Sequence, residues 1–268
     1  MSKPQILLTN DDGIQSPGLW AAAEALSELG FVHVVAPRDQ FSGAGRSLPS
    51  TSDGILAEQK VVIHGNEWTV YSVGGTPAQA VLHGILEILP SRPDLVVSGI
   101  NYGENMGIAI TVSGTVGAAL EAAAQGIPAL AVSLETDIAN HLSYSPEIDF
   151  LPAAHFTQVF ARQMLEKRMP VDVDVLKIDI PQDATLTTPW QVTCLTRQTY
   201  FTALPPVRTP GDPRGPLGYK IEYDPDQDPP ATDAYVVRKS RLVSVTPLSL
   251  DMTSRVDLRD FGRLLAAD

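Results

Sequence analysis

The stretch that decides the fold is Gln5-Ile6-Leu7-Leu8-Thr9-Asn10-Asp11-Asp12-Gly13, an apolar run of strand length that ends in two adjacent carboxylates. Side chains alternate between the two faces of a continuing strand, so Asp11 and Asp12 can face one point only if the backbone turns. Gly13 permits that turn. Two carboxylates at one point favour a bound cation, but Asn-Asp-Asp-Gly is also ordinary turn chemistry. The motif alone leaves both interpretations open.

Outward from this stretch, short apolar runs alternate with longer segments of helical period as far as about Pro181. This order is typical of βαβ units and predicts an α/β fold, with a mostly parallel sheet covered by helices on both faces. The predicted strands are residues 5–9, 33–36, 95–98, 129–133 and 175–180. The predicted helices are residues 19–29, 79–89, 116–125 and 150–167. Residues 61–64 and 68–72 predict a β-hairpin around Gly65-Asn66.

The chain beyond Pro181 has a different composition. Residues 204–230 are dense in Pro, Gly and Asp, which excludes a helix or a central strand. Composition alone favours a long surface segment, and the alternative is an arm that packs on another subunit. Residues 241–246 predict a further strand and residues 253–265 a closing amphipathic helix.

Length and charge limit the classes of function. A chain of 268 residues can bury a large core, and its formal net charge of -12 repels long anionic polymers. We therefore expect no long nucleic acid as a partner. A small phosphate ester is not excluded, because a bound divalent ion would make the local electrostatic potential positive.

No run approaches the roughly 18 to 20 apolar residues of a membrane span, and no leader pattern precedes the first strand. The single Cys194 fits a reducing compartment and is expected to be a small buried side chain. Together these features predict a cytoplasmic protein with no membrane partner.

Three polar loops are expected to meet at one edge of the sheet. Ligands bind beyond the carboxyl ends of the strands in an open parallel sheet, and right-handed crossovers place these loops at the same edge. The loops are residues 10–13, residues 37–47 with Ser42 and Gly43, and residues 99–107 with Asn101, Glu104 and Asn105. They supply carboxylate, hydroxyl and amide oxygens without Cys or His, which favours Mg, Mn or Ca over zinc. Each residue taken alone is also an ordinary loop residue.

A fourth loop offers a seat for an anion. Ser113-Gly114-Thr115 precedes the Ala-rich helix predicted at residues 116–125, and free N–H groups at a helix N-terminus bind phosphate. A simple Ser or Thr cap is the alternative. The sequence has no G-x-G-x-x-G after its first strand, no G-x-x-x-x-G-K-[ST] and no G-x-S-x-G. Dinucleotide-dependent enzymes, ordinary nucleoside triphosphatases and serine hydrolases are therefore disfavoured.

Several motifs in order along the chain resemble the SurE family of survival proteins, the 5'/3'-nucleotidases. These motifs are Asn10-Asp11-Asp12-Gly13, Ala36-Pro37 with Ser42-Gly43, Gly74-Gly75-Thr76-Pro77-Ala78, residues 93–101 (PDLVVSGIN) with Gly103-Glu104-Asn105, Ser113-Gly114-Thr115-Val116-Gly117-Ala118-Ala119, Thr232-Asp233-Ala234-Tyr235 and residues 243–248 (VSVTPL). The resemblance spans most of the chain.

The resemblance implies a Rossmann-like, three-layer α/β fold with a Pro/Gly-rich C-terminal oligomerisation arm. It implies one SurE-like domain over residues 1–268, with a core that carries the metal site over residues 1–181. Residues 182–268 would form a C-terminal extension with an intersubunit arm and the closing helix. A homodimer or homotetramer formed through that arm follows from the same resemblance.

The resemblance also implies a site and an activity. Asp11, Asp12, Ser42 and Asn101 would hold one divalent metal ion per subunit, with Asp11 and Asp12 as the catalytic residues. The substrate-binding residues would be Asn10, Gly43, Asn105, Ser113, Gly114 and Thr115. The expected reaction is hydrolysis of nucleoside 5'- and 3'-monophosphates to nucleoside and phosphate by metal-activated water. A phosphatase that forms an aspartyl-phosphate and a non-catalytic nucleotide or phosphate sensor are the alternatives.

The chain departs from the family pattern at three places. Arg38-Asp39 follows Ala-Pro where the family often has Asp first, and Gln79-Ala80 replaces the usual Asp-Cys. The commonly Asn-rich strand near Ile180 reads Leu176-Lys177-Ile178-Asp179-Ile180-Pro181. None of these changes removes an expected metal ligand, so they bear on base preference and on the surroundings of the site.

Overall fold

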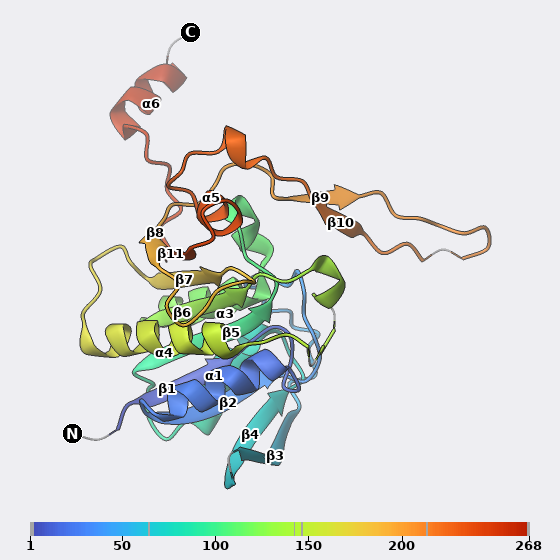
Figure 1. The fold of residues 1–268 in the computed structure, drawn as a ribbon, viewed down its shortest axis with the longest axis vertical. Coiled ribbons are helices and arrows are strands. Elements are labelled where there is room, and N and C mark those ends of the chain that lie inside the picture. Colours follow the sequence, from blue (N-terminus) through green and yellow to red (C-terminus); the bar gives the residue numbers. More distant parts are fainter. Residues whose placement is uncertain (1–2, 64, 142, 146, 213, 267–268) are drawn as a thin grey trace.

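A mostly parallel sheet forms the centre of the computed structural model, which describes residues 3–63, 65–141, 143–145, 147–212 and 214–266 (Figure 1). In spatial order its described strands are β3 (Leu56–Ile63), β4 (Asn66–Val73), β2 (Phe31–Pro37), β1 (Gln5–Thr9), β5 (Leu95–Tyr102), β6 (Ala129–Leu134), β7 (Val175–Ile180), β11 (Val243–Leu248) and β8 (Trp190–Val192). The strands from β4 to β7 are parallel, whereas β3 and β11 pair antiparallel with β4 and β7. The predicted α/β fold is confirmed.

Helices cover both faces of the sheet. Helices α1 (Pro17–Ser27) and α4 (Leu151–Glu166) pack on one face, and α2 (Pro77–His83) and α3 (Gly114–Ala124) on the other (Figure 1). The remaining helical elements are the π-helical η1 (Gly84–Ile88), the 3-10 turns η2 (Gly107–Val112), η3 (Ile138–Asn140) and η4 (Pro225–Gln227), and the helices α5 (Asp233–Arg238) and α6 (Leu258–Ala266). The central strands are apolar on both faces because each face is buried under a helical layer.

The bounds of some elements differ from the sequence prediction. The helix predicted at residues 79–89 is divided into α2 and the π-helical η1. The hairpin is longer than predicted, with β3 and β4 paired over their full lengths, and His64 of the predicted first strand lies outside the described residues. Strands β1 and β7 begin and end where the sequence predicts them.

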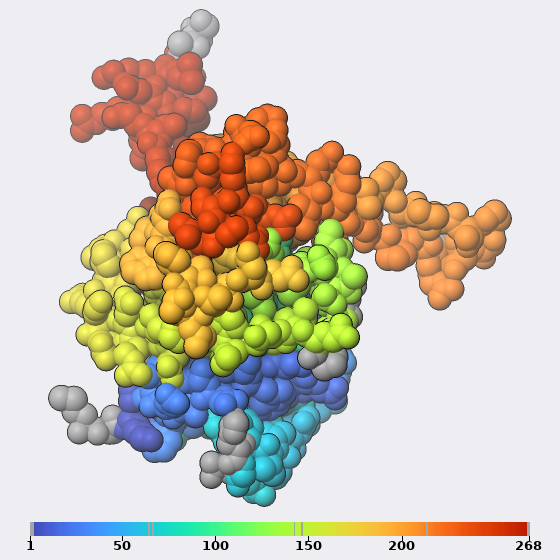
Figure 2. Space-filling model, in the orientation of Figure 1, coloured from blue at the N-terminus to red at the C-terminus, as the bar shows by residue number. Residues whose placement is uncertain are grey.

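The C-terminal part both completes the sheet and projects from it. Strands β11 and β8 lie in the main sheet, so the sheet continues past the core boundary expected at residue 181. A separate antiparallel ribbon of β9 (Phe201–Leu204) and β10 (Gly218–Ile221) extends away from the body, as does α6 (Figures 1 and 2). Helix α6 starts five residues later than the helix predicted from residue 253.

Two further findings concern the single cysteine and the helices. Cys194 is exposed and its thiol donates to the Ala231 carbonyl at 3.6 Å, so the expected burial of this side chain is wrong. Sequence could not show this, because Cys194 lies in the irregular segment after β8 rather than in the strand. None of the helices in the described part of the chain combines the length and the apolar character needed to cross a bilayer.

Strand order places the site. Strand β1 lies between β2 and β5, so the chain leaves β1 toward one side of the sheet and later returns on its other side. Such a switch point opens a crevice at the carboxyl ends of the strands, where ligands bind in open α/β sheets. The acidic couple follows β1 at this position.

Candidate active site

The turn after β1 is closed by Asn10. Its Oδ1 accepts the Gly13 N–H at 3.1 Å and its Nδ2 donates to the Gly13 carbonyl at 3.0 Å. Gly13 has a φ of +94°, which favours glycine. Both ends of the Asn10 amide thus hold the turn, so this residue shows the turn chemistry that the motif alone left open.

Asp11 is held against the start of α3. The hydroxyl of Thr115 donates to Asp11 Oδ1, and the Asp11 side chain is 6% exposed. A Cβ atom at Gly114 would lie 2.8 Å from Asp11 Oδ2, so a glycine is needed for this close approach. The Asp11 carbonyl accepts the N–H of Phe41 at 2.8 Å, which joins the loop after β2 to the same point.

Asp12 is held by the loop after β2, by the end of β5 and by Tyr144. Its Oδ1 accepts from Gln40 Nε2 at 2.9 Å, and its Oδ2 accepts the N–H of Tyr102 at 3.1 Å. The Tyr144 hydroxyl donates to the Asp12 carbonyl at 2.6 Å. The residue is 2% exposed. Asp12 therefore joins the turn after β1 to the loop after β2 and to the carboxyl end of β5, which lie at one edge of the sheet.

The electrostatics of the acidic couple favour a cation. Burial raises the pKa of the Asp11 carboxyl, against the hydrogen bond from Thr115. Burial and then the charge of Asp11 raise the pKa of Asp12 well above its ordinary value. No described Lys or Arg forms an ion pair with either carboxylate. A hard divalent ion would supply the missing positive charge, so the residues present fit one.

The other expected metal ligands offer neutral oxygens. Ser42 is exposed and lies next to Phe41, whose N–H bonds the Asp11 carbonyl. Asn101 donates from Nδ2 to the Gly103 carbonyl at 2.7 Å, and no hydrogen bond to its Oδ1 is found among the described residues. Clusters of three or more His, Cys, Asp or Glu suited to a metal are absent from the described part of the chain. The ligands beyond the two carboxylates would therefore be neutral.

The residues expected to bind substrate differ in their contacts and in their exposure. Ser113 Oγ accepts the N–H of Val116 at 3.1 Å and so caps α3. The Thr115 hydroxyl is bonded to Asp11, and Gly43 is exposed in the loop after β2. Asn105 donates from Nδ2 to Ser133 Oγ at 2.8 Å. The N-terminus of α3 thus lies beside Asp11, where the Gly114 and Thr115 N–H groups bond to the Asp11 carboxylate and the Ser113 N–H donates to the Ile110 carbonyl at 3.2 Å.

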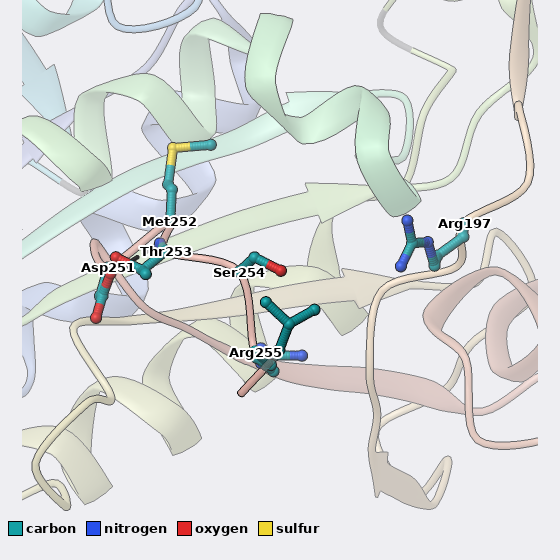
Figure 3. Close-up of a pocket in the computed structure, with 7 residues that line it drawn as sticks. Arg197, Asp251, Met252, Thr253, Ser254 and Arg255 are labelled. Atoms are coloured by element: carbon teal, nitrogen blue, oxygen red, sulfur yellow. Dashed lines mark hydrogen bonds between the residues drawn. The ribbon is translucent and has the colours of Figure 1, made fainter. Parts of the chain in front are cut away.

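The hollow drawn in Figure 3 is a different place. It has a volume of about 590 Å³ and is lined by Arg197 and residues 251–256, none of which was expected in the site. Arg197 faces the C-terminal segment across an open gap in Figure 3. We place the site at the acidic couple, because buried carboxylates at a switch point carry chemistry that this open surface hollow lacks.

Sequence reasoning missed two residues that hold the acidic couple and gave a third, Thr115, a different role. Gln40 lies in a loop that was expected to contribute, and an amide two residues before Ser42 was the available signal. Tyr144 lies 132 residues from Asp12 and gave no local signal. Thr115 was expected to contact phosphate, whereas its hydroxyl orients Asp11.

Comparison with known proteins identifies relatives along nearly the whole chain. The family model described as "Survival protein SurE" matches residues 6–202. The "5'-nucleotidase SurE" of Thermococcus gammatolerans is 44% identical over 262 residues, which cover 97% of this chain and 96% of that protein. The protein of the same name from Methanocella arvoryzae is 43% identical over 266 residues and covers 97% of each chain. The crystal structure of the SurE protein from Aquifex aeolicus has a TM-score of 0.75 at 34% identity, covering 98% of this chain and 100% of that one. The chain belongs to the SurE family.

Proposed function

We propose that this chain is a divalent-metal-dependent phosphomonoesterase that hydrolyses nucleoside 5'- and 3'-monophosphates to nucleoside and phosphate. The observation that carries the proposal is the buried, adjacent pair Asp11 and Asp12 at the switch point, beside the N-terminus of α3. Curated relatives that cover nearly the whole chain are named 5'-nucleotidase. We extend the proposal to 3'-monophosphates, which these names do not mention.

One metal ion per subunit is proposed, held by Asp11, Asp12, Ser42 and Asn101. Mg, Mn and Ca are the ions that such an oxygen donor set suits. When bound, the ion would polarise the phosphoryl oxygens and lower the pKa of a water molecule. We place this chemistry in the cytoplasm, where the exposed Cys194 would stay reduced.

The chain's own residues orient the reactants. Thr115 fixes Asp11, while Gln40 and the Tyr102 N–H fix Asp12. One of the two carboxylates takes the proton of the water that attacks phosphorus, and the ester P–O bond on the opposite side breaks. That proton is then passed to the leaving nucleoside oxygen, so nucleoside and phosphate are released. Ser113, Gly114 and Thr115 at the N-terminus of α3 are the proposed phosphate contacts, next to Asp11, whose charged form the Gly114 and Thr115 N–H groups also favour. Asn10 supports this arrangement by holding the turn, and Gly43 and Asn105 are proposed to contact the substrate.

A nucleotide panel tests the proposed activity. With Mg or Mn present, we expect release of phosphate from nucleoside monophosphates, and we expect EDTA to abolish it because the carboxylates then lack their cation. Phosphate release is measured with each metal, with chelator, and after the metal is restored. Binding of a nucleotide without turnover would instead support a sensor and overturn the enzymatic assignment.

The proposed assembly is a homodimer or homotetramer that uses the C-terminal segment, with the β9–β10 ribbon and α6 as the contacts. Apolar side chains of α6 are exposed and lie on one face of the helix at positions i, i+3, i+6 and i+7: Leu258, Phe261, Leu264 and Leu265. An unpartnered apolar helix face of this kind fits a second copy of the chain.

A charge on that helix face tests the assembly. We expect Phe261→Asp to lower the mass of the particle, measured by light scattering after size-exclusion chromatography, because a carboxylate in an apolar interface costs several kcal/mol unless it is paired. Arg259→Gln changes the net charge by the same amount on an exposed position of the same helix and is expected to leave the mass unchanged. An unaltered mass for Phe261→Asp would exclude α6 from the interface.

A further inference from the structure

A buried ion network lies next to the site and has no part in the mechanism above. Lys177 and Asp179 are two residues apart on β7, so their side chains share one face of the sheet, and both side chains are 0% exposed. Lys177 Nζ contacts Asp179 Oδ2, lies 3.1 Å from Asp233 Oδ2 and donates to the Asn105 carbonyl at 2.8 Å. A buried ammonium costs several kcal/mol unless it is paired, so these partners need an explanation.

The network holds the backbone of a single loop. Asp179 Oδ1 accepts the N–H of Asn105 at 2.8 Å, and Asp233 Oδ2 accepts the N–H of Gly107 at 2.8 Å. With the Lys177 bond to the Asn105 carbonyl, three backbone groups within residues 105–107 end on the network. Backbone groups that no strand or helix satisfies are fixed here by charged side chains, whose hydrogen bonds are the stronger kind.

This loop connects two parts of the proposed site. Asn101, an expected metal ligand, precedes it at the end of β5, and η2 leads from it to the N-terminus of α3. The Asn105 side chain is fixed as well, by its bond to Ser133 on β6. A shift of residues 105–107 would therefore displace both Asn101 and the N-terminus of α3.

Charge balance makes Lys177 and Asp179 dependent on each other. Burial opposes the charge of Lys177, yet attraction to Asp179 and Asp233 raises its pKa. Asp233 has further support, because its Oδ1 accepts the N–H groups of Thr196 and Ala234, each at 2.9 Å. Removing Lys177 alone would leave two carboxylates facing each other without a cation, whereas removing the charge of Asp179 leaves a matched Lys177–Asp233 pair.

We propose that Lys177 and Asp179 are positioning residues that act as one unit, with Asp233, to fix residues 101–107 for substrate binding and turnover. The proposal rests on the proposed function. The unit works through matched charge and through the acceptor that Asp179 offers to the Asn105 N–H. We therefore expect Lys177→Met alone to reduce substrate turnover, and we expect Asp179→Asn added to it to restore the charge balance of the network.

Steady-state kinetics on four proteins test the proposal. At a temperature where circular dichroism shows each protein folded, we expect Lys177→Met to lower kcat/KM for nucleoside monophosphate by about 100-fold, the cost of a misplacement of about 1 Å. The double variant Lys177→Met/Asp179→Asn is expected to recover at least tenfold of that loss. Asp179→Asn alone is expected to remain near the parent. Thr246→Val, a buried change opposite Lys177 on β11, is the matched control and is expected to keep full kcat/KM.

Hydrogen exchange gives a readout that needs no activity. The amides of Asn105 and Gly107 are expected to lose protection in Lys177→Met and to regain it in the double variant, even if nucleotides were the wrong substrates. Where Lys177→Met does not fold, Asp179→Ala replaces it, since the Lys177–Asp233 pair stays matched and the Asn105 N–H loses its acceptor. Unchanged protection and unchanged kcat/KM in a folded Lys177→Met, or equal values for Asp179→Ala and Asp179→Asn, would overturn the proposal.

Discussion

Asp11→Asn and Asp12→Asn are each expected to lower kcat for nucleotide hydrolysis by about 1,000-fold or more, which corresponds to about 4 kcal/mol of transition-state stabilisation. Each variant removes one of the two charges that would hold the cation, while the amide keeps the size of the side chain. The measurements are kcat with saturating Mg or Mn and metal affinity by isothermal titration calorimetry. Metal affinity is expected to fall together with kcat.

The fold is expected to survive both substitutions. Burial raises the pKa of both carboxyls, and the charge of Asp11 raises that of Asp12 further, so an uncharged amide relieves a cost in the metal-free protein. The melting temperature without metal should therefore not decrease. Asp39→Asn, an exposed change in the neighbouring loop, is the control and is expected to keep full activity. Full activity of Asp11→Asn and Asp12→Asn would refute the assignment of both residues.

The parts of the fold that follow from local pattern could be predicted from the sequence. Strand β1 and its acidic turn were predicted correctly, because an apolar run and a glycine that takes a positive φ are both local signals. The meeting of the loops after β1, β2 and β5 followed from strand direction and crossover handedness. The C-terminal strands β8, β9 and β10 were not predicted, because they are short and their pairing partners are distant in the sequence.

Contacts between residues far apart in the sequence limited how much of the site could be predicted. Lys177 and Asp179 alternate with apolar residues on β7, a pattern that usually describes a strand with one exposed face. Both are buried instead, because Asp233 comes from α5 and completes the ion network. Thr115 and Asp11 are separated by 104 residues, and sequence could not show that the hydroxyl faces the carboxylate rather than a ligand. The residue types pointed to a site, whereas tertiary contacts decide which atoms support it.

Stability is expected to fall between pH 5 and pH 8 because of Glu104, which lies in the loop that follows Asn101 and the end of β5. Glu104 is 2% exposed, and burial raises the pKa of its carboxyl from 4.5 to about 7, against the hydrogen bond from the Tyr200 hydroxyl at 2.5 Å. The charge of Glu135 raises this pKa and that of Arg238 lowers it. Its Oε2 has no hydrogen-bond partner among the described residues.

The sign of the pH effect follows from proton binding. Between about pH 4.5 and 7 the folded protein keeps a proton on Glu104 that the unfolded chain has released, so the free energy of unfolding decreases as pH rises. Stabilisation from this group is fully present below pH 4.5 and lost above pH 7. The loss amounts to about 3 kcal/mol at most, from the size of the shift. Urea denaturation between pH 5 and pH 8 measures it.

Glu104→Gln isolates this contribution, because glutamine is neutral throughout the range and its carbonyl still accepts from Tyr200. The difference in unfolding free energy between the parent and this variant should change by about 2 to 3 kcal/mol from pH 5 to pH 8, with the parent losing stability. Tyr200→Phe removes the hydrogen bond that favours the ionised carboxylate, so its loss of stability over the same range should be steeper than in the parent. Parallel curves for the parent and Glu104→Gln would show that Glu104 ionises as readily in the folded protein as in the unfolded chain, and that its burial beside Tyr200 carries no such cost.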